Sequence, residues 1–279
     1  MSLVILAALG VVGLAVGFLS GLVGIGGGVL IVPFLYFFYD HQTWSGTAVP
    51  EELLVTVAHA TSLFVIVPTA MTGTLTYSRA RLVAWQAAVP IALFSVAAAA
   101  VGATLAVEMP ADALSFFFGL FLAFTGIQLA GTKPRKETKP LRLQLWVTAL
   151  TGTLVGLLSA TLGVGGGLVA IPMLLYVVRI DVARVAATSL AVVGLAALSG
   201  SITYIVNGAG LPGRPPGSLG FVHATAALPI LIGSMFAVRW GAKANQKVNR
   251  KLLRWLFGAA FIVMGLRLAW QSGVRLFFG

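Results

Sequence analysis

The chain has 279 residues, of which 59% are hydrophobic and only 9% are charged. A soluble globular protein carries roughly 25% charged residues, so this composition excludes a water-soluble domain and indicates a polytopic membrane protein. The apolar runs are continuous rather than alternating, which predicts membrane-spanning α-helices instead of an outer-membrane barrel. Cysteine is absent, which excludes disulfides, thiolate metal sites and cysteine nucleophiles.

Four apolar segments, the first interrupted by glycines, precede a polar linker, and four more follow it. The segments before the linker are 3–39, 51–78, 83–107 and 113–130; the linker is 131–140; the later segments are 141–178, 184–206, 219–240 and 251–272. A straight helix over 3–39 would be roughly 55 Å long, whereas a bilayer core of roughly 30 Å takes about 20 helical residues. The first segment of each half must therefore break, and its glycines mark the place.

The two halves repeat the same sequence pattern. Residues 17–28 read GFLSGLVGIGGG and residues 156–167 read GLLSATLGVGGG, with Pro33 and Pro172 following. The later stretches ATSL (60–63) and TGTLTY (72–77) recur as ATSL (187–190) and SGSITY (199–204). The chain is thus predicted to be a tandem duplication, with repeat 1 at residues 1–130 and repeat 2 at residues 141–279.

The charges invert between equivalent loops of the two repeats. Acidic loops of repeat 1 match basic loops of repeat 2, and the basic pair Arg79 and Arg81 matches a loop that holds only Arg214. The positive-inside rule then places the linker in the cytoplasm and both termini outside, which predicts two inverted-topology repeats in an inner membrane. This distribution fits a lipid surface better than nucleic acid, although the net charge is +11. An odd number of crossings per repeat requires the first segment to be a hairpin or re-entrant pair.

Consecutive glycines in a membrane interior are expected only beside protein or a water-filled cavity. They admit positive φ, so that backbone N–H groups can converge on an anion, and the helix that follows points its positive end at the same place. The alternative is close helix packing by small residues. The candidate anion-binding glycines are Gly24, Gly26, Gly27, Gly28, Gly163, Gly165, Gly166 and Gly167.

The doubled G-[IV]-G-G-G-x(4)-P motif, with a serine four residues before each copy, resembles the TauE/SafE family of membrane permeases. The resemblance covers nearly the whole chain. It implies a secondary transporter that exports a small oxyanion, such as sulfite or an organosulfonate, with coupling to the proton gradient. A passive anion channel that uses the glycine tips as its filter is the alternative. No enzyme motif, metal site or cofactor is expected, and the sequence is compatible with a monomer or a homo-oligomer.

Polar residues near the glycines could complete a substrate site. Hydroxyls donate hydrogen bonds to an oxyanion without a buried charge, although they equally well bond a nearby carbonyl or a neighbouring helix. The candidate hydroxyls are Ser20, Thr61, Ser62, Ser159, Thr188 and Ser189. His59, whose counterpart in repeat 2 is Ala186, is the candidate for proton coupling, because histidine titrates near neutral pH. A neutral, hydrogen-bonded packing role is its alternative.

Overall fold

The computed structural model describes residues 3–40, 49–131, 141–245 and 250–278, and in these ranges the chain is almost entirely helical. The linker expected at 131–140 lies outside the described residues except for Gly131. In chain order the elements are α1 (Leu3–Val23), α2 (Gly28–Asp40), α4 (Glu51–Arg79), α5 (Trp85–Glu108), α6 (Ala111–Gly131), α7 (Leu145–Thr161), α8 (Gly167–Pro172), the π-helix η1 (Met173–Val177), α9 (Val182–Asn207), β1 (Ser218–Leu219), β2 (Val222–His223), α10 (Ala224–Ala244) and α11 (Arg250–Phe278).

Six of the described helices are long and apolar enough to cross a membrane: α1, α4, α5, α6, α9 and α10. Many of their large apolar side chains are exposed, as a lipid-facing surface requires. The expected class, an all-α polytopic membrane protein, is confirmed.

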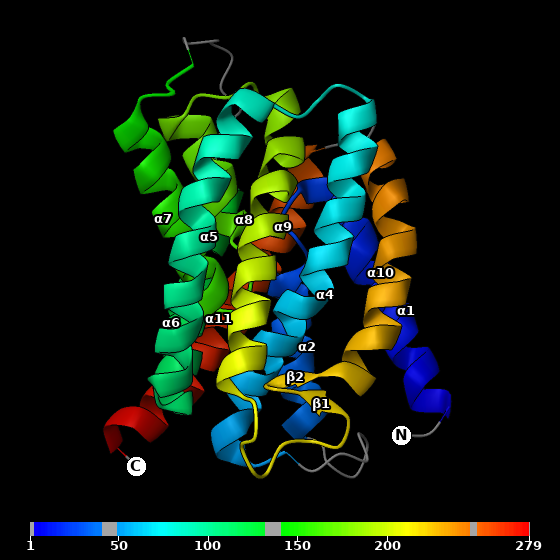
Figure 1. The fold of residues 1–279 in the computed structure, drawn as a ribbon, viewed down its shortest axis with the longest axis vertical. Helices are drawn as coiled ribbons and strands as arrows, with labels where there is room; N and C mark the ends of the chain where they lie inside the picture. The colour runs from blue at the N-terminus through cyan, green and yellow to red at the C-terminus, as the bar shows by residue number, and fades with distance from the viewer. Residues whose placement is uncertain (1–2, 41–48, 132–140, 246–249, 279) are drawn as a thin grey trace.

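The first segment of each repeat breaks where the glycines lie. α1 ends at Val23 and α2 begins at Gly28, while α7 ends at Thr161 and α8 begins at Gly167. In Figure 1, α1 enters from the lower end and α7 from the upper end, and each chain turns back inside the molecule. Both chain termini lie at the lower end. We call residues 24–27 and 163–166 the first and second tips.

One expected segment begins later than the sequence indicated. The apolar stretch from residue 219 first forms an antiparallel hairpin, in which Ser218 pairs with His223 and Leu219 with Val222. The helix α10 begins only at Ala224. The hairpin turns at Gly220, whose φ of 57° is a conformation that glycine adopts without steric cost.

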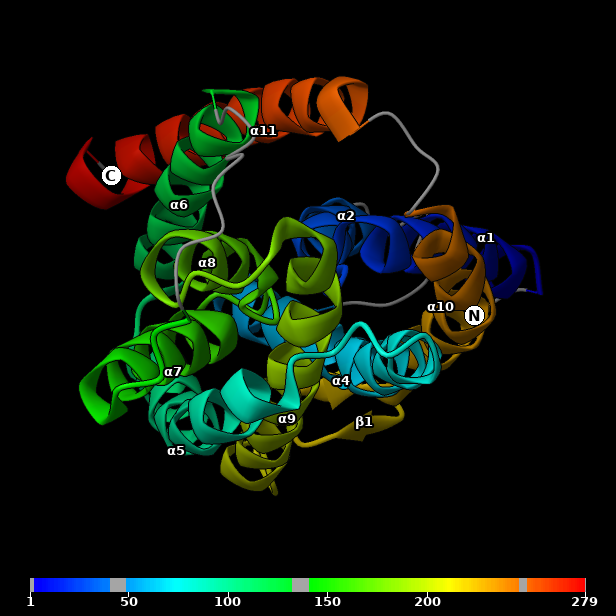
Figure 2. The ribbon, with the colours of Figure 1, turned by 90° about the horizontal axis from the view of Figure 1, so that it is seen from above.

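The helices pack in pairs that join the two halves of the sequence. α1 packs on α10, α7 on α5, α4 on α9 and α6 on α11, and Figure 2 shows the first three pairs around the molecule and the α6–α11 pair along one side. The first two pairs make matching contacts: a Cβ on Gly17 would lie 2.3 Å from the Ser234 carbonyl oxygen, and one on Gly156 would lie 2.1 Å from that of Ser95. Small residues therefore let these helix backbones approach closely.

Candidate functional site

The two tips share one backbone conformation. Three glycines in each tip have positive φ: Gly24 (82°), Gly26 (87°) and Gly27 (86°), and Gly163 (65°), Gly165 (78°) and Gly166 (72°). A side chain would be strained at all six positions. The positive φ that the sequence analysis inferred for the tips is therefore present at the same three places in each.

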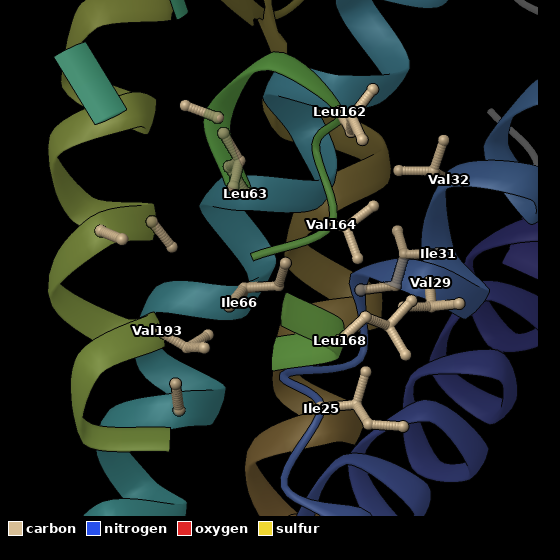
Figure 3. Packing of buried hydrophobic residues seen from close by; sticks show 14 of the residues in the cluster. Ile25, Val29, Ile31, Val32, Leu63, Ile66, Leu162, Val164, Leu168 and Val193 are labelled. Carbon is tan, nitrogen blue, oxygen red and sulfur yellow. The ribbon is translucent and has the colours of Figure 1, made fainter. Parts of the chain in front are cut away.

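The tips also contact one another in the interior of the molecule. A Cβ on Gly28 would lie 2.6 Å from the Val164 carbonyl oxygen, and a Cβ on Gly167 would lie 2.1 Å from that of Ile25. Figure 3 shows the apolar side chains that gather at this contact, among them Ile66 of α4. Gly28 and Gly167 thus serve close packing of tip on tip.

Each tip is completed by a helix from the other half of the chain. In the first tip, a Cβ on Gly24 would lie 2.6 Å from the Ala186 Cα of α9, whereas in the second, a Cβ on Gly163 would lie 2.5 Å from the His59 Cα of α4. Ser189 follows Ala186 by one turn of α9, and Ser62 follows His59 by one turn of α4. The first tip therefore faces the Ser189 turn, and the second faces the Ser62 turn.

Four of the predicted hydroxyls are buried and have no hydrogen-bond partner in the part of the chain that the structure describes. They form two equivalent pairs, Ser20 with Ser159 and Ser62 with Ser189, and each side chain is at most 1% exposed. A Cβ on Gly27 would lie 3.8 Å from the Ser20 Oγ, and one on Gly166 would lie 3.0 Å from the Ser159 Cβ. Because a buried polar atom without a partner costs about 1–3 kcal/mol, a repeated set of four calls for a functional explanation.

The two predicted threonines are already engaged. The Thr61 Oγ1 accepts a hydrogen bond from the His223 backbone N–H at 3.0 Å, and the Thr188 Oγ1 accepts one from the Ala84 N–H at 3.1 Å. Thr188 also donates to the Arg184 carbonyl at 2.8 Å. His223 and Ala84 are the residues just before α10 and α5, and backbone N–H groups at a helix start have no partner within their own helix. The two threonine hydroxyls supply that partner.

His59 is completely buried and uses both ring nitrogens. Its Nδ1 lies 3.0 Å from the carbonyl oxygen of Thr161, at the end of α7, and its Nε2 lies 2.6 Å from the Tyr36 hydroxyl of α2. Because a carbonyl only accepts, we assign the proton to Nδ1, and the Tyr36 hydroxyl then donates to Nε2. His59 therefore connects α2, the helix that follows the first tip, with the end of α7, the helix that precedes the second tip.

A second tyrosine of α2 contacts the other buried histidine. The Tyr39 hydroxyl lies 3.1 Å from the His223 Nδ1, and the same hydroxyl also bonds the Thr61 side chain. Sequence reasoning missed both tyrosines. A hydroxyl-bearing residue repeated three positions apart in a short apolar half-helix was the available signal, because the two side chains point to neighbouring parts of one helix face.

These features define a class: a multi-pass α-helical membrane protein whose two glycine-broken hairpins meet inside the helix bundle. Comparison with known proteins identifies the family. Residues 9–268 match the family model described as "Sulfite exporter TauE/SafE", and the chain belongs to this family of membrane transporters.

Related proteins cover nearly the same length. The chain is 31% identical to a probable membrane transporter protein of Methanocaldococcus jannaschii, with 95% of each chain aligned. It is 27% identical to one of Haemophilus influenzae, over 92% of this chain and 95% of the relative. It is 25% identical to YunE of Bacillus subtilis, over 98% and 99%. No solved structure matches the chain.

Proposed function

We propose that the protein is a secondary transporter that exports a small oxyanion, such as sulfite or an organosulfonate, across the inner membrane. The observation that carries this proposal is the set of four buried serine hydroxyls that have no hydrogen-bond partner among the described residues. Hydroxyl donors can take over the hydration of an oxyanion without burying a countercharge.

Two half-sites follow from the tip contacts. The first consists of Ser20, the glycines of residues 24–27 and Ser189, and the second of Ser159, the glycines of residues 163–166 and Ser62. Each draws on both repeats, so a relative movement of the repeats would assemble or separate its donors. In the closed arrangement Ile66 and Val193 lie within 3.6 Å of a Cβ built on Gly26. The tips must therefore move apart from these side chains before an anion can enter.

Transport by alternating access follows if the repeats are inverted in the membrane, with both termini outside and the linker inside. The two hairpins that enter from opposite ends support this topology. Single cysteines in this cysteine-free chain can test it, because an impermeant maleimide should label position 210 on intact cells but not position 80. Equal labelling of both positions would contradict the topology.

His59 is proposed to carry the coupled proton. It lies against the second tip and bonds the last residue of α7, so its protonation would be sensed at one half-site only. Protonation of Nε2 would reverse the bond to Tyr36, because an N–H donates where the neutral nitrogen accepts.

The test of the proposed function combines binding and flux. Sulfite, sulfate, thiosulfate, sulfoacetate and chloride are added in turn to the purified protein, and a bound anion raises the apparent Tm by mass action. Proteoliposomes then measure movement of the anion that stabilises the protein most. Saturable flux driven by a pH gradient supports the transporter, conductance at channel rates supports the passive pore, and neither binding nor flux of any oxyanion contradicts both.

A further inference from the structure

A group of arginines surrounds the upper end of the molecule, above the second tip. It comes from three segments: the last residue of α4 with the loop before α5 (79–84), the stretch before α7 (141–144), and the loop after η1 with the first residues of α9 (178–184). Figure 2 looks down on this end. The upper arginine cluster consists of Arg79, Arg81, Arg142, Arg179 and Arg184.

Two hydrogen bonds hold the three segments together. The Arg184 Nη2 donates to the Val83 carbonyl oxygen at 3.0 Å, and the Arg142 N–H donates to the Val178 carbonyl oxygen at 2.9 Å. The second bond ends on Val178, directly after η1, and the first ends on Val83, in the loop between α4 and α5. Four of the five arginine side chains are exposed and Arg179 is half-buried, so the charge is presented to solvent at one place.

The charge of the cluster is opposed by a single acid within these three segments. Asp181 is that acid, and its carboxylate already accepts a bond from the Ala183 N–H at the start of α9. The lower end is the reverse, since its helix ends carry several carboxylates. These are Asp40, Glu51, Glu52, Glu108 and Asp112. An anion therefore meets a more positive field at the upper end than at the lower end, where Arg275 offsets only part of the acidic charge.

Backbone conformation sets two of these arginines apart. Arg81 (φ 56°) and Arg179 (φ 67°) are the only non-glycine residues with positive φ in the described ranges of the chain. Each follows the end of a helical segment, where glycine is the usual and least strained residue. Two unrelated helix ends thus accept a strained residue that carries a positive charge, and strain of this kind collects at functional positions.

We propose that the upper arginine cluster is a capture surface for the anionic substrate, which concentrates small oxyanions at the end of the molecule above the second tip before they reach the half-sites. This inference rests on the proposed function. It adds that the apparent affinity differs between the two faces of the membrane, being higher at the arginine face. With that face in the cytoplasm, the same asymmetry favours loading from inside.

The test uses a triple variant, Arg79→Gln, Arg81→Gly and Arg142→Gln, in inside-out and right-side-out membrane vesicles. Initial rates are measured with radiolabelled sulfite, and with thiosulfate as a second probe. The variant should raise the KM about 3- to 10-fold at low salt in inside-out vesicles and leave the maximal rate unchanged. The difference should vanish near 1 M salt, where the Debye length is about 3 Å.

Two controls separate this surface from a structural or topological role. Arg275→Gln removes an exposed charge at the lower end and should leave the KM of inside-out vesicles unchanged. Arg81→Gly alone should keep or raise the Tm, because it relieves the positive φ. An unchanged KM in the triple variant, with normal wild-type flux, would overturn the capture surface and leave the proposed function intact. Absence of wild-type flux for both probes in both kinds of vesicle would overturn the two together.

Discussion

The helices that return from the two tips occupy equivalent positions but differ in structure and chemistry. α2 is a continuous 13-residue α-helix, whereas its counterpart is a six-residue helix followed by a five-residue π-helix. α2 carries Tyr36 and Tyr39, which bond two buried histidines. The equivalent residues of the second half are Leu175 and Val178.

This difference separates what the repeats share from what they do not. The glycine conformations and the unpartnered serines occur in both halves, as the proposed pair of half-sites requires. Among the described residues, the tyrosine–histidine bonds occur only on α2, and they fix this helix to α4 and to β2, just before α10, by directional contacts. The π-helix, a form that is rare and often found at functional sites, marks the return helix of the second tip as the one with the less regular backbone.

The largest expected effect concerns the contact that both tips make equally. Gly28→Ala and Gly167→Ala should each abolish the monodisperse size-exclusion peak in detergent, because the new Cβ would meet the opposing backbone at 2.6 Å or less. Neither backbone can move without moving its tip. Gly10→Ala is the matched control, since its Cβ would have only a 4.0 Å contact. A folded Gly167→Ala protein would show that the second tip, unlike the first, can shift.

Removal of the serine hydroxyls should reduce transport and spare the fold. Ser62→Ala and Ser189→Ala should each lower flux about tenfold or more, which corresponds to the loss of one hydrogen bond to a charged group. The Tm should stay constant or rise, because the lost hydroxyl has no partner within the described ranges of the chain. Flux into proteoliposomes and thermal unfolding in detergent give the two readouts.

The control for the serines is Ser95→Ala, whose hydroxyl donates to the Ala92 carbonyl within its own helix. It should leave flux near the wild-type value. Equal losses for Ser62→Ala and Ser189→Ala would support equivalent half-sites, whereas a loss for one alone would show that the repeats are unequal at the site as well. Wild-type flux in both variants would contradict the half-sites.

Sequence patterns predicted the parts that repeat and missed the parts that depend on packing. The breaks at the glycines and the helical class follow from local conformation and hydropathy, which a sequence displays directly. That the first tip packs on α9 and the second on α4 could not be predicted from the sequence, because each tip crosses to a helix of the other half of the chain. Thr61 and Thr188 matched as well as the serines did, yet their hydroxyls bond backbone N–H groups that no pattern reveals.

A smaller effect is expected where the return helices differ. Tyr36→Phe removes the donor to the His59 Nε2 and should weaken the dependence of flux on the pH gradient while leaving downhill flux measurable. The change removes the hydrogen-bond partner of the His59 Nε2 and so alters how that nitrogen gains a proton. All serines and glycines of the half-sites stay in place. Leu175→Phe, at the equivalent place in the second half, adds an aromatic ring without a hydroxyl bond and should leave the pH dependence unchanged. Retention of full proton coupling in Tyr36→Phe would argue against His59 as the proton carrier.

The smallest expected effect lies at the C-terminal end of α2, where Tyr39 bonds His223. Tyr39→Phe should lower the stability by about 1 kcal/mol, the net value of one neutral hydrogen bond, and so shift the Tm by only about 2–4 °C. Because Val178 has no hydroxyl to lose, Val178→Ala probes only packing at the equivalent position. The pH dependence then distinguishes the bond from mere packing.

Burial lowers the pKa of His223 to about 4, whereas an exposed histidine in the unfolded chain titrates near 6.5. The unfolded state therefore binds a proton first as the pH falls, so the stability present above about pH 6.5 is lost progressively toward pH 4. His223→Gln replaces the imidazole by an amide, which can still bond Tyr39 but does not titrate. This variant should flatten the fall of Tm over this pH range. Tyr39→Phe should instead retain part of that fall, because its histidine stays buried. An identical pH profile in wild type and His223→Gln would assign the acid sensitivity to other groups.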